Sequence, residues 1–60
     1  MTVSEFDRAH VGDILAGMGD WFTAELLRLI RHADSVNRER LRIAFPEAVA
    51  AFERWERDRG

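Results

Sequence analysis

The 60-residue sequence contains no cysteine and a single proline, Pro46. Without cysteine the chain can form no disulfide, thiolate nucleophile or cysteine-ligated zinc site, and this composition fits the reducing environment of the cytoplasm. The sequence also lacks an apolar run close to the roughly 20 residues that a membrane-spanning helix needs. Glu5 and Asp7 lie where a secretory signal peptide would carry positive charge. We therefore expect a soluble, cytoplasmic protein that has no membrane partner.

The short length limits how the chain can reach stability. Residues 1–60 can form only a single small helical domain, which buries only about 60% of the surface that its unfolded form exposes. Hydrophobic residues make up 47% of the sequence, and no disulfide supplements the core. Tight helix packing and oligomerisation are the remaining routes to stability, and the high apolar content favours oligomerisation. We expect a homo-oligomer.

The net charge of −2 is unevenly distributed along the chain. Residues 1–27 carry five acidic side chains and one arginine, a sum of −4. Residues 28–44 carry five arginines and two acidic side chains, a sum of +3, and the remainder is close to balanced. An acidic half next to a basic segment favours either electrostatic attraction between subunits or a basic surface for another partner.

Residues 20–33 carry the strongest helical pattern in the sequence. At 100° per residue, their large apolar side chains fill one arc of about 160°. Asp20 is a favourable N-cap whose carboxylate would lie at the positive end of the helix. Gly17 and Gly19 interrupt any helix that precedes it. We predict that this helix forms the centre of the core.

Residues 3–17 predict a helix before this central one. Thr2 with Glu5, or Ser4 with Asp7, has the spacing of a capping box, and the apolar residues that follow share one side. Gly12 weakens the middle of this helix by about 1 kcal/mol relative to alanine.

Two more helices are predicted after the central one. Asp34 or Ser35 caps a helix over residues 35–44, and Pro46 disfavours helical geometry at Phe45. Proline is well suited to the first position of a helix, which we predict over residues 46–57. The fold class is therefore all-α, with three or four short helices (about 3–17, 20–33, 35–44 and 46–57) in a compact bundle. The expected core consists of Phe22, Leu26, Leu29, Ile30, Leu41, Phe45, Val49 and Phe52.

The stretch from about residue 19 to residue 55 carries a pattern formed by Asp20, Trp21, Phe22, Thr23, Leu26, Leu27, Leu29, Ile30, Ala33, Asp34, Asn37, Arg38, Leu41, Phe45, Pro46, Val49 and Trp55. This pattern resembles a group of short uncharacterised proteins of actinobacteria and their bacteriophages. The resemblance implies a source class and no known activity, so it assigns no functional residue.

Two histidines are the only candidates for catalysis or metal binding. His10 lies three residues from Asp7 and from Asp13, and His32 lies seven residues from Glu25. Such pairs can orient an imidazole as a base or hold a metal. The sequence has no nucleophile motif and no glycine-rich phosphate loop, and a 60-residue monomer has little room for a pocket. We predict that the protein is not an enzyme and uses no cofactor or metal.

A polar stripe on the central helix is the stronger candidate site. Trp21, Glu25, Arg28 and His32 follow at spacings of four, three and four, which places an indole opposite the core side of the helix. Tryptophan and arginine are enriched at protein interfaces. The alternative is that the N-terminal helix folds back and covers Trp21. The interface candidates are Trp21, Glu25, Arg28, His32, Arg40 and Trp55.

In residues 35–44 we expect Arg38, Glu39 and Arg42 to face solvent, and Asn37 and Arg40 to lie within the apolar arc.

We predict a non-enzymatic interaction or regulatory protein of phage type that self-associates and has a possible host or phage protein partner.

The alternative function is a helix-turn-helix-like DNA-binding regulator that contacts phosphates through Arg38, Arg40 and Arg42. It ranks second because the turn lacks glycine and the net charge is negative.

Overall fold

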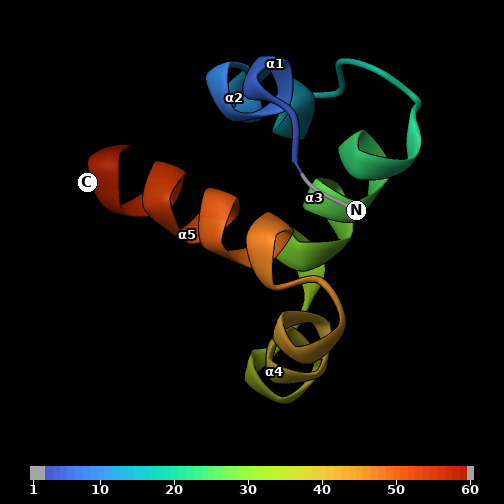
Figure 1. Cartoon of the computed structure of the whole chain (residues 1–60), viewed down its shortest axis with the longest axis vertical. Helices are drawn as coiled ribbons and strands as arrows, with labels where there is room; N and C mark the ends of the chain where they lie inside the picture. The colour runs from blue at the N-terminus through green and yellow to red at the C-terminus, as the bar shows by residue number, and fades with distance from the viewer. Residues whose placement is uncertain (1–2, 60) are drawn as a thin grey trace.

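The computed structural model describes residues 3–59, and it confirms the all-α fold class. Over that range the chain forms five helices and no strand: α1 (Glu5–Ala9), α2 (Val11–Leu15), α3 (Phe22–His32), α4 (Ser35–Ala44) and α5 (Pro46–Arg59). Figure 1 shows α1 and α2 at one end of the molecule and α4 at the opposite end, with α3 and α5 between them. No helix in the described range is long and apolar enough to cross a membrane.

The segment predicted as one helix over residues 3–17 is divided into two short helices at His10. The backbone of His10 leaves the helical region, with φ −121° and ψ 22°. Its ring stacks on Phe6 with the centroids 4.0 Å apart, and its Nδ1 lies 2.8 Å from the Phe6 carbonyl oxygen. Ser4 begins α1 through a capping box with Asp7, which confirms one of the two predicted caps. The other, Thr2, lies outside the described residues.

A close approach between α2 and α5 explains the glycine in the middle of the predicted first helix. A Cβ added at Gly12 would lie 3.2 Å from Nε1 of Trp55, which is closer than most Cβ contacts. Glycine at this position therefore lets the indole of α5 pack against the backbone of α2.

The central helix begins later than predicted. Its N-cap is Trp21, whose backbone is extended with φ −76° and ψ 166°, so Asp20 lies one residue before the cap position. Gly19, just before, has φ +85°, and a Cβ there would lie 2.1 Å from the Trp21 ring. The corner therefore requires glycine both for its backbone conformation and for the space that the indole occupies.

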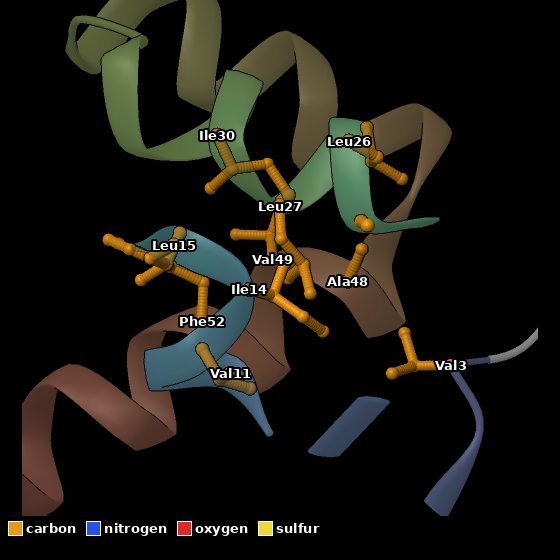
Figure 2. Packing of buried hydrophobic residues seen from close by; sticks show 11 residues of the cluster. Val3, Val11, Ile14, Leu15, Leu26, Leu27, Ile30, Ala48, Val49 and Phe52 are labelled. Carbon is orange, nitrogen blue, oxygen red and sulfur yellow. The ribbon is translucent and has the colours of Figure 1, made fainter. Parts of the chain in front are cut away.

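The core lies between α2, α3 and α5 and includes a contribution from Val3 (Figure 2). Leu26, Ile30, Val49 and Phe52 are buried as predicted, and Leu41 and Phe45 pack partly against them. The cluster of buried apolar residues is Val3, Val11, Ile14, Leu15, Ala24, Leu26, Leu27, Ile30, Ala48, Val49 and Phe52.

Two residues expected in the core are exposed instead. Phe22 is 56% exposed and Leu29 is 54% exposed. The apolar arc of α3 is wider than its neighbours can cover: α2 and α5 pack on the side that carries Ala24, Leu27 and Ile30. The prediction of Phe22 and Leu29 as core residues is therefore wrong.

The bounds of α4 agree with the prediction, but its orientation does not. Asp34 caps the helix by accepting a hydrogen bond from the Asn37 amide at 2.8 Å. Helix α4 contains no buried residue. Arg38 and Arg42, expected to face solvent, are half-buried, whereas Asn37 and Arg40, expected within the apolar arc, are exposed.

Candidate interaction surfaces

Trp21 lies against the N-terminal helix. Its ring meets Phe6 edge-on with the centroids 6.0 Å apart, and its Nε1 donates a hydrogen bond to Oδ1 of Asp7 at 2.9 Å. The side chain remains 38% exposed. Helix α1 therefore covers part of Trp21, which was the alternative to an interface with another chain.

Arg28 of the predicted stripe is bound within its own chain. Its guanidinium donates to the carbonyl oxygens of Ile14 at 2.8 Å, Met18 at 3.1 Å and Gly19 at 2.7 Å. These carbonyls lie at the end of α2 and in the corner after it, where a helix leaves acceptors unpaired. Arg28 thus holds the corner between α2 and α3, and these bonds turn its guanidinium towards its own chain.

The other two members of the stripe are exposed. The side chains of Glu25 and His32 form no hydrogen bond or ion pair with any other residue in the range 3–59. The predicted stripe is therefore not one uniform surface, because Trp21 and Arg28 contact α1 and the corner while Glu25 and His32 face outwards.

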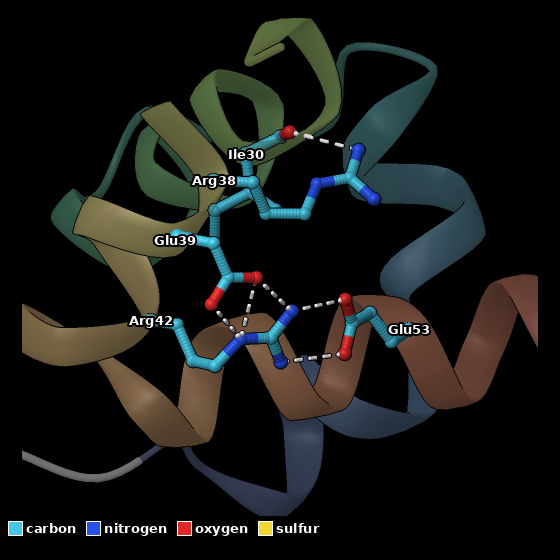
Figure 3. Close-up of polar contacts among 5 residues, drawn as sticks. All are labelled: Ile30, Arg38, Glu39, Arg42 and Glu53. Atoms are coloured by element: carbon cyan, nitrogen blue, oxygen red, sulfur yellow. Dashed lines mark hydrogen bonds and ion pairs between the residues drawn. The ribbon is translucent and has the colours of Figure 1, made fainter. Parts of the chain in front are cut away.

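The basic segment is engaged mainly with α5. Figure 3 shows Arg42 between Glu39 of its own helix and Glu53 of α5. The pair with Glu53 is bidentate, at 2.9 and 2.8 Å, and the nearest contact with Glu39 is 3.1 Å. Hydrogen bonds to Glu53 and then Glu39 raise the pKa of Arg42, and the bonds from Arg42 hold the pKa of Glu53 below its ordinary value.

Arg38 also faces inwards. Its guanidinium lies over the ring of Phe52, 5.0 Å from the centroid, and donates to the carbonyl oxygen of Ile30 at 3.4 Å. Its Nε is buried and has no hydrogen-bond partner within residues 3–59. Arg38 and Arg42 attach α4 to the body of the molecule, whereas Arg40 is exposed. The three candidate arginines therefore do not share one face.

The outward face of α4 carries two large exposed apolar side chains, which were not predicted from the sequence as part of a surface. Val36 is 59% exposed and Ile43 is 85% exposed, the largest value among the exposed large hydrophobic residues. Glu39 and Arg40 lie between them at the i+3 and i+4 positions, so the four side chains form one stripe. The spacing of seven between Val36 and Ile43 was visible in the sequence, but neither residue was predicted as part of the core or of an interaction surface.

Trp55 lies at the edge of an open groove between α1 and α5. It packs against Phe52, with ring centroids 6.1 Å apart, and Arg59 lies 4.7 Å from a ring centroid of Trp55. The groove has a volume of about 790 Å³, and Ala9, Ala50 and Ala51 line it together with charged residues of both signs. It presents a mixed surface on which Arg54 and Asp58 form an exposed ion pair at 3.8 Å.

The candidate catalytic pairs are not assembled. His10 contacts Phe6, while the carboxylate of Asp7 accepts from Trp21 and from the Ser4 amide. Over the described range, no cluster of three histidine, cysteine or acidic side chains could hold a metal ion.

Comparisons with known proteins identify no relative: neither a protein-family model, nor a curated protein, nor a solved structure matches the chain.

Proposed function

We propose that the protein is a cytoplasmic, non-enzymatic interaction protein of phage type, which associates with itself and regulates a protein partner of the host or the phage. The observation that supports this most is the apolar outer face of α4, where Val36 and Ile43 are exposed on a helix that buries none of its own residues. Large exposed apolar side chains that share one face are typical of a surface that another molecule covers.

The distribution of the polar groups supports the same proposal. Arg28, Arg38 and Arg42 bond within the chain and hold the helices together. The polar groups of these side chains therefore stabilise the fold. The exposed side chains of α4 remain as the surface that a partner could contact. A 60-residue domain without disulfides also gains more from association than a larger one would.

Thermal unfolding at different protein concentrations tests this proposal. If the associated form is the stable one, the melting temperature must rise with concentration, because dissociation and unfolding are linked. We expect a clear rise over about a hundredfold range of concentration. A melting temperature that does not depend on concentration, together with a mass of 7.0 kDa throughout, would contradict self-association.

DNA binding is a second candidate, and one observation favours it. A connection of only two residues joins α3 to α4, as in a helix-turn-helix, and α4 exposes Asn37 and Arg40, side chains that can read bases. It ranks second because Arg42 is paired with Glu39 and Glu53, and the guanidinium of Arg38 is held over the ring of Phe52. Retention of duplex DNA that falls steeply with salt, and that Arg40→Ala weakens, would promote this candidate.

A further inference from the structure

A pocket between α2 and α5 brings together arginines from three different helices. It has a volume of about 400 Å³ and lies where the end of α2 approaches the last turns of α5. Its guanidinium groups come from Arg31 of α3, Arg38 of α4 and Arg59 of α5. Among the described residues, Glu56 is the one acidic side chain that lines it. Three positive charges and one negative charge leave the pocket with a formal net charge of +2.

The charges of this pocket have no counter-ion within the chain. Over residues 3–59, none of its three arginines forms an ion pair, and neither does Glu56. The carboxylates of Glu39 and Glu53 both bond Arg42 instead (Figure 3). Like charges that are gathered without counter-ions repel one another, so an anion that entered the pocket would remove an unfavourable interaction.

Two aromatic rings hold two of the guanidinium groups at the pocket. The guanidinium of Arg38 lies over the ring of Phe52, 5.0 Å from the centroid. That of Arg59 lies 4.7 Å from a ring centroid of Trp55, and the two rings pack against each other with their centroids 6.1 Å apart. Cation–π contacts of this kind orient a guanidinium without using its N–H donors.

Most of the hydrogen-bond donors of these arginines are unused within the fold. Arg31 donates to the carbonyl oxygen of Leu15 at 3.2 Å, and Arg38 donates to that of Ile30 at 3.4 Å. Each of them makes only this one hydrogen bond within residues 3–59, and Arg59 makes none there. A guanidinium carries five N–H donors, so the pocket has a surplus of donors as well as of positive charge.

We propose that this pocket binds the phosphate group of a small molecule. A phosphate monoester carries a charge of about −1.5 to −2 at pH 7, which matches the formal charge of the pocket. Its oxygens accept several hydrogen bonds at once, and the planar fork of arginine donates them in pairs. The inference goes beyond self-association and does not use the outer face of α4.

The size of the pocket favours a small molecule over a nucleic acid. A volume of about 400 Å³ lies within the range of small-molecule sites, and it leaves room for a second phosphate or for the molecule that carries the group. The chain as a whole has a net charge of −2. An extended polyanion would therefore meet repulsion outside the pocket, whereas a small anion would not.

Calorimetric titration with inorganic phosphate and with pyrophosphate tests the site. Sodium chloride at the same ionic strength is the blank. We expect saturable binding of one anion per chain. Tighter binding of pyrophosphate would assign the pocket to molecules with two linked phosphates, and equal affinities would assign it to a single phosphate group. No binding of either anion above the blank, up to about 10 mM, would overturn the proposal.

A matched pair of variants on α5 shows where the anion binds. Arg59 and Arg57 are both exposed, but only Arg59 lines the pocket. Arg59→Gln should raise the dissociation constant by about tenfold, because a charge-assisted contact is lost, and Arg57→Gln should change it by about twofold or less. Arg31→Gln, at another exposed position of the lining, should act like Arg59→Gln. Equal effects of Arg59→Gln and Arg57→Gln would overturn the site.

Removal of the acidic side chain should strengthen binding. Glu56→Gln takes away the negative charge that opposes an anion and should lower the dissociation constant by about threefold or more. Glu25→Gln removes the same charge from an exposed position of α3 outside the lining and should change it less. An affinity that Glu56→Gln leaves unchanged or weakens would contradict the proposal.

A titration with duplex DNA at the same ionic strength separates the two sources of phosphate. We expect DNA to bind more weakly than pyrophosphate. DNA that binds more tightly, and that Arg59→Gln weakens, would overturn the assignment to a small molecule.

Discussion

The indole Nε1 of Trp21 donates a hydrogen bond to Oδ1 of Asp7 at 2.9 Å and so connects the start of α3 to α1. The same carboxylate accepts from the Ser4 amide, and the Asp7 amide donates to the Ser4 hydroxyl at 3.0 Å. One buried aspartate therefore both caps the five-residue helix α1 and fixes it to the central helix.

Replacement of Asp7 by alanine should lower the free energy of unfolding by about 1 to 3 kcal/mol, because a charged acceptor and a helix cap are lost together. Chemical denaturation measures the change. Asp13→Ala, at an exposed position of α2, is the matched control and should cost about 0.5 kcal/mol or less. Equal losses in the two variants would show that neither the cap nor the bond with Trp21 contributes to stability.

Truncation of two leucines on one helix separates the core from the exposed arc. Leu27 is fully buried, whereas Leu29 is 54% exposed. Leu27→Ala should cost about 2 to 5 kcal/mol, because it leaves a cavity in a packed core, and Leu29→Ala should cost about 1 kcal/mol or less. Helix propensity changes equally in both variants, so it cancels from the comparison. A larger loss for Leu29→Ala would mean that the rotation of α3 is wrong.

The ion pair between Arg42 and Glu53 predicts a dependence of stability on pH. Arg42 lowers the pKa of Glu53 in the folded protein. The pair therefore stabilises the fold above the ordinary glutamate pKa of about 4.3, and this contribution is lost as the pH falls through the lowered value. Glu53→Gln should melt below wild type at neutral pH, and the difference should shrink as the solution is acidified. Glu56→Gln, at an exposed position of the same helix, is the control. A difference that grew on acidification would have the wrong sign.

Trp21→Ala distinguishes cover by α1 from cover by another chain. Because Phe6 and Asp7 already contact the indole, we expect a loss of about 1 to 3 kcal/mol that is the same at dilute and concentrated protein. Melting curves at two concentrations measure it. Unchanged stability with weakened association would instead place Trp21 in an interface.

The local signals in the sequence predicted much of the fold. The cap at Asp34, the proline that begins α5 and the glycines before α3 each act within a few residues, so they can be read without knowledge of the tertiary structure. Leu26 and Ile30 were also predicted to be buried, because they lie well within the apolar arc of their helix.

The exposure of individual side chains on α3 and α4 could not be predicted, because it depends on which side of each helix its neighbouring helices cover. Periodicity placed Leu29 in the core, but it could not show that α2 and α5 cover only part of the arc. Arg38 was predicted to face solvent, because periodicity cannot show that its guanidinium lies over the ring of Phe52 and donates to the Ile30 carbonyl oxygen. Val36 and Ile43 were predicted neither as core residues nor as a surface, because their exposure depends on how α4 packs on α5, and that exposure gave the candidate site.

Sedimentation equilibrium of wild-type protein and of Ile43→Asp tests the central claim, self-association through α4, most directly. Ile43 is 85% exposed, so the substitution should leave the monomer folded while it places a carboxylate in the proposed contact. Between about 10 µM and about 1 mM, a range suited to a weak dimer, the mass of wild-type protein should rise from 7.0 kDa towards twice that value. The folded variant should remain near 7.0 kDa throughout. A wild-type mass that stays at 7.0 kDa, or a variant that associates as strongly as wild type, would contradict the account.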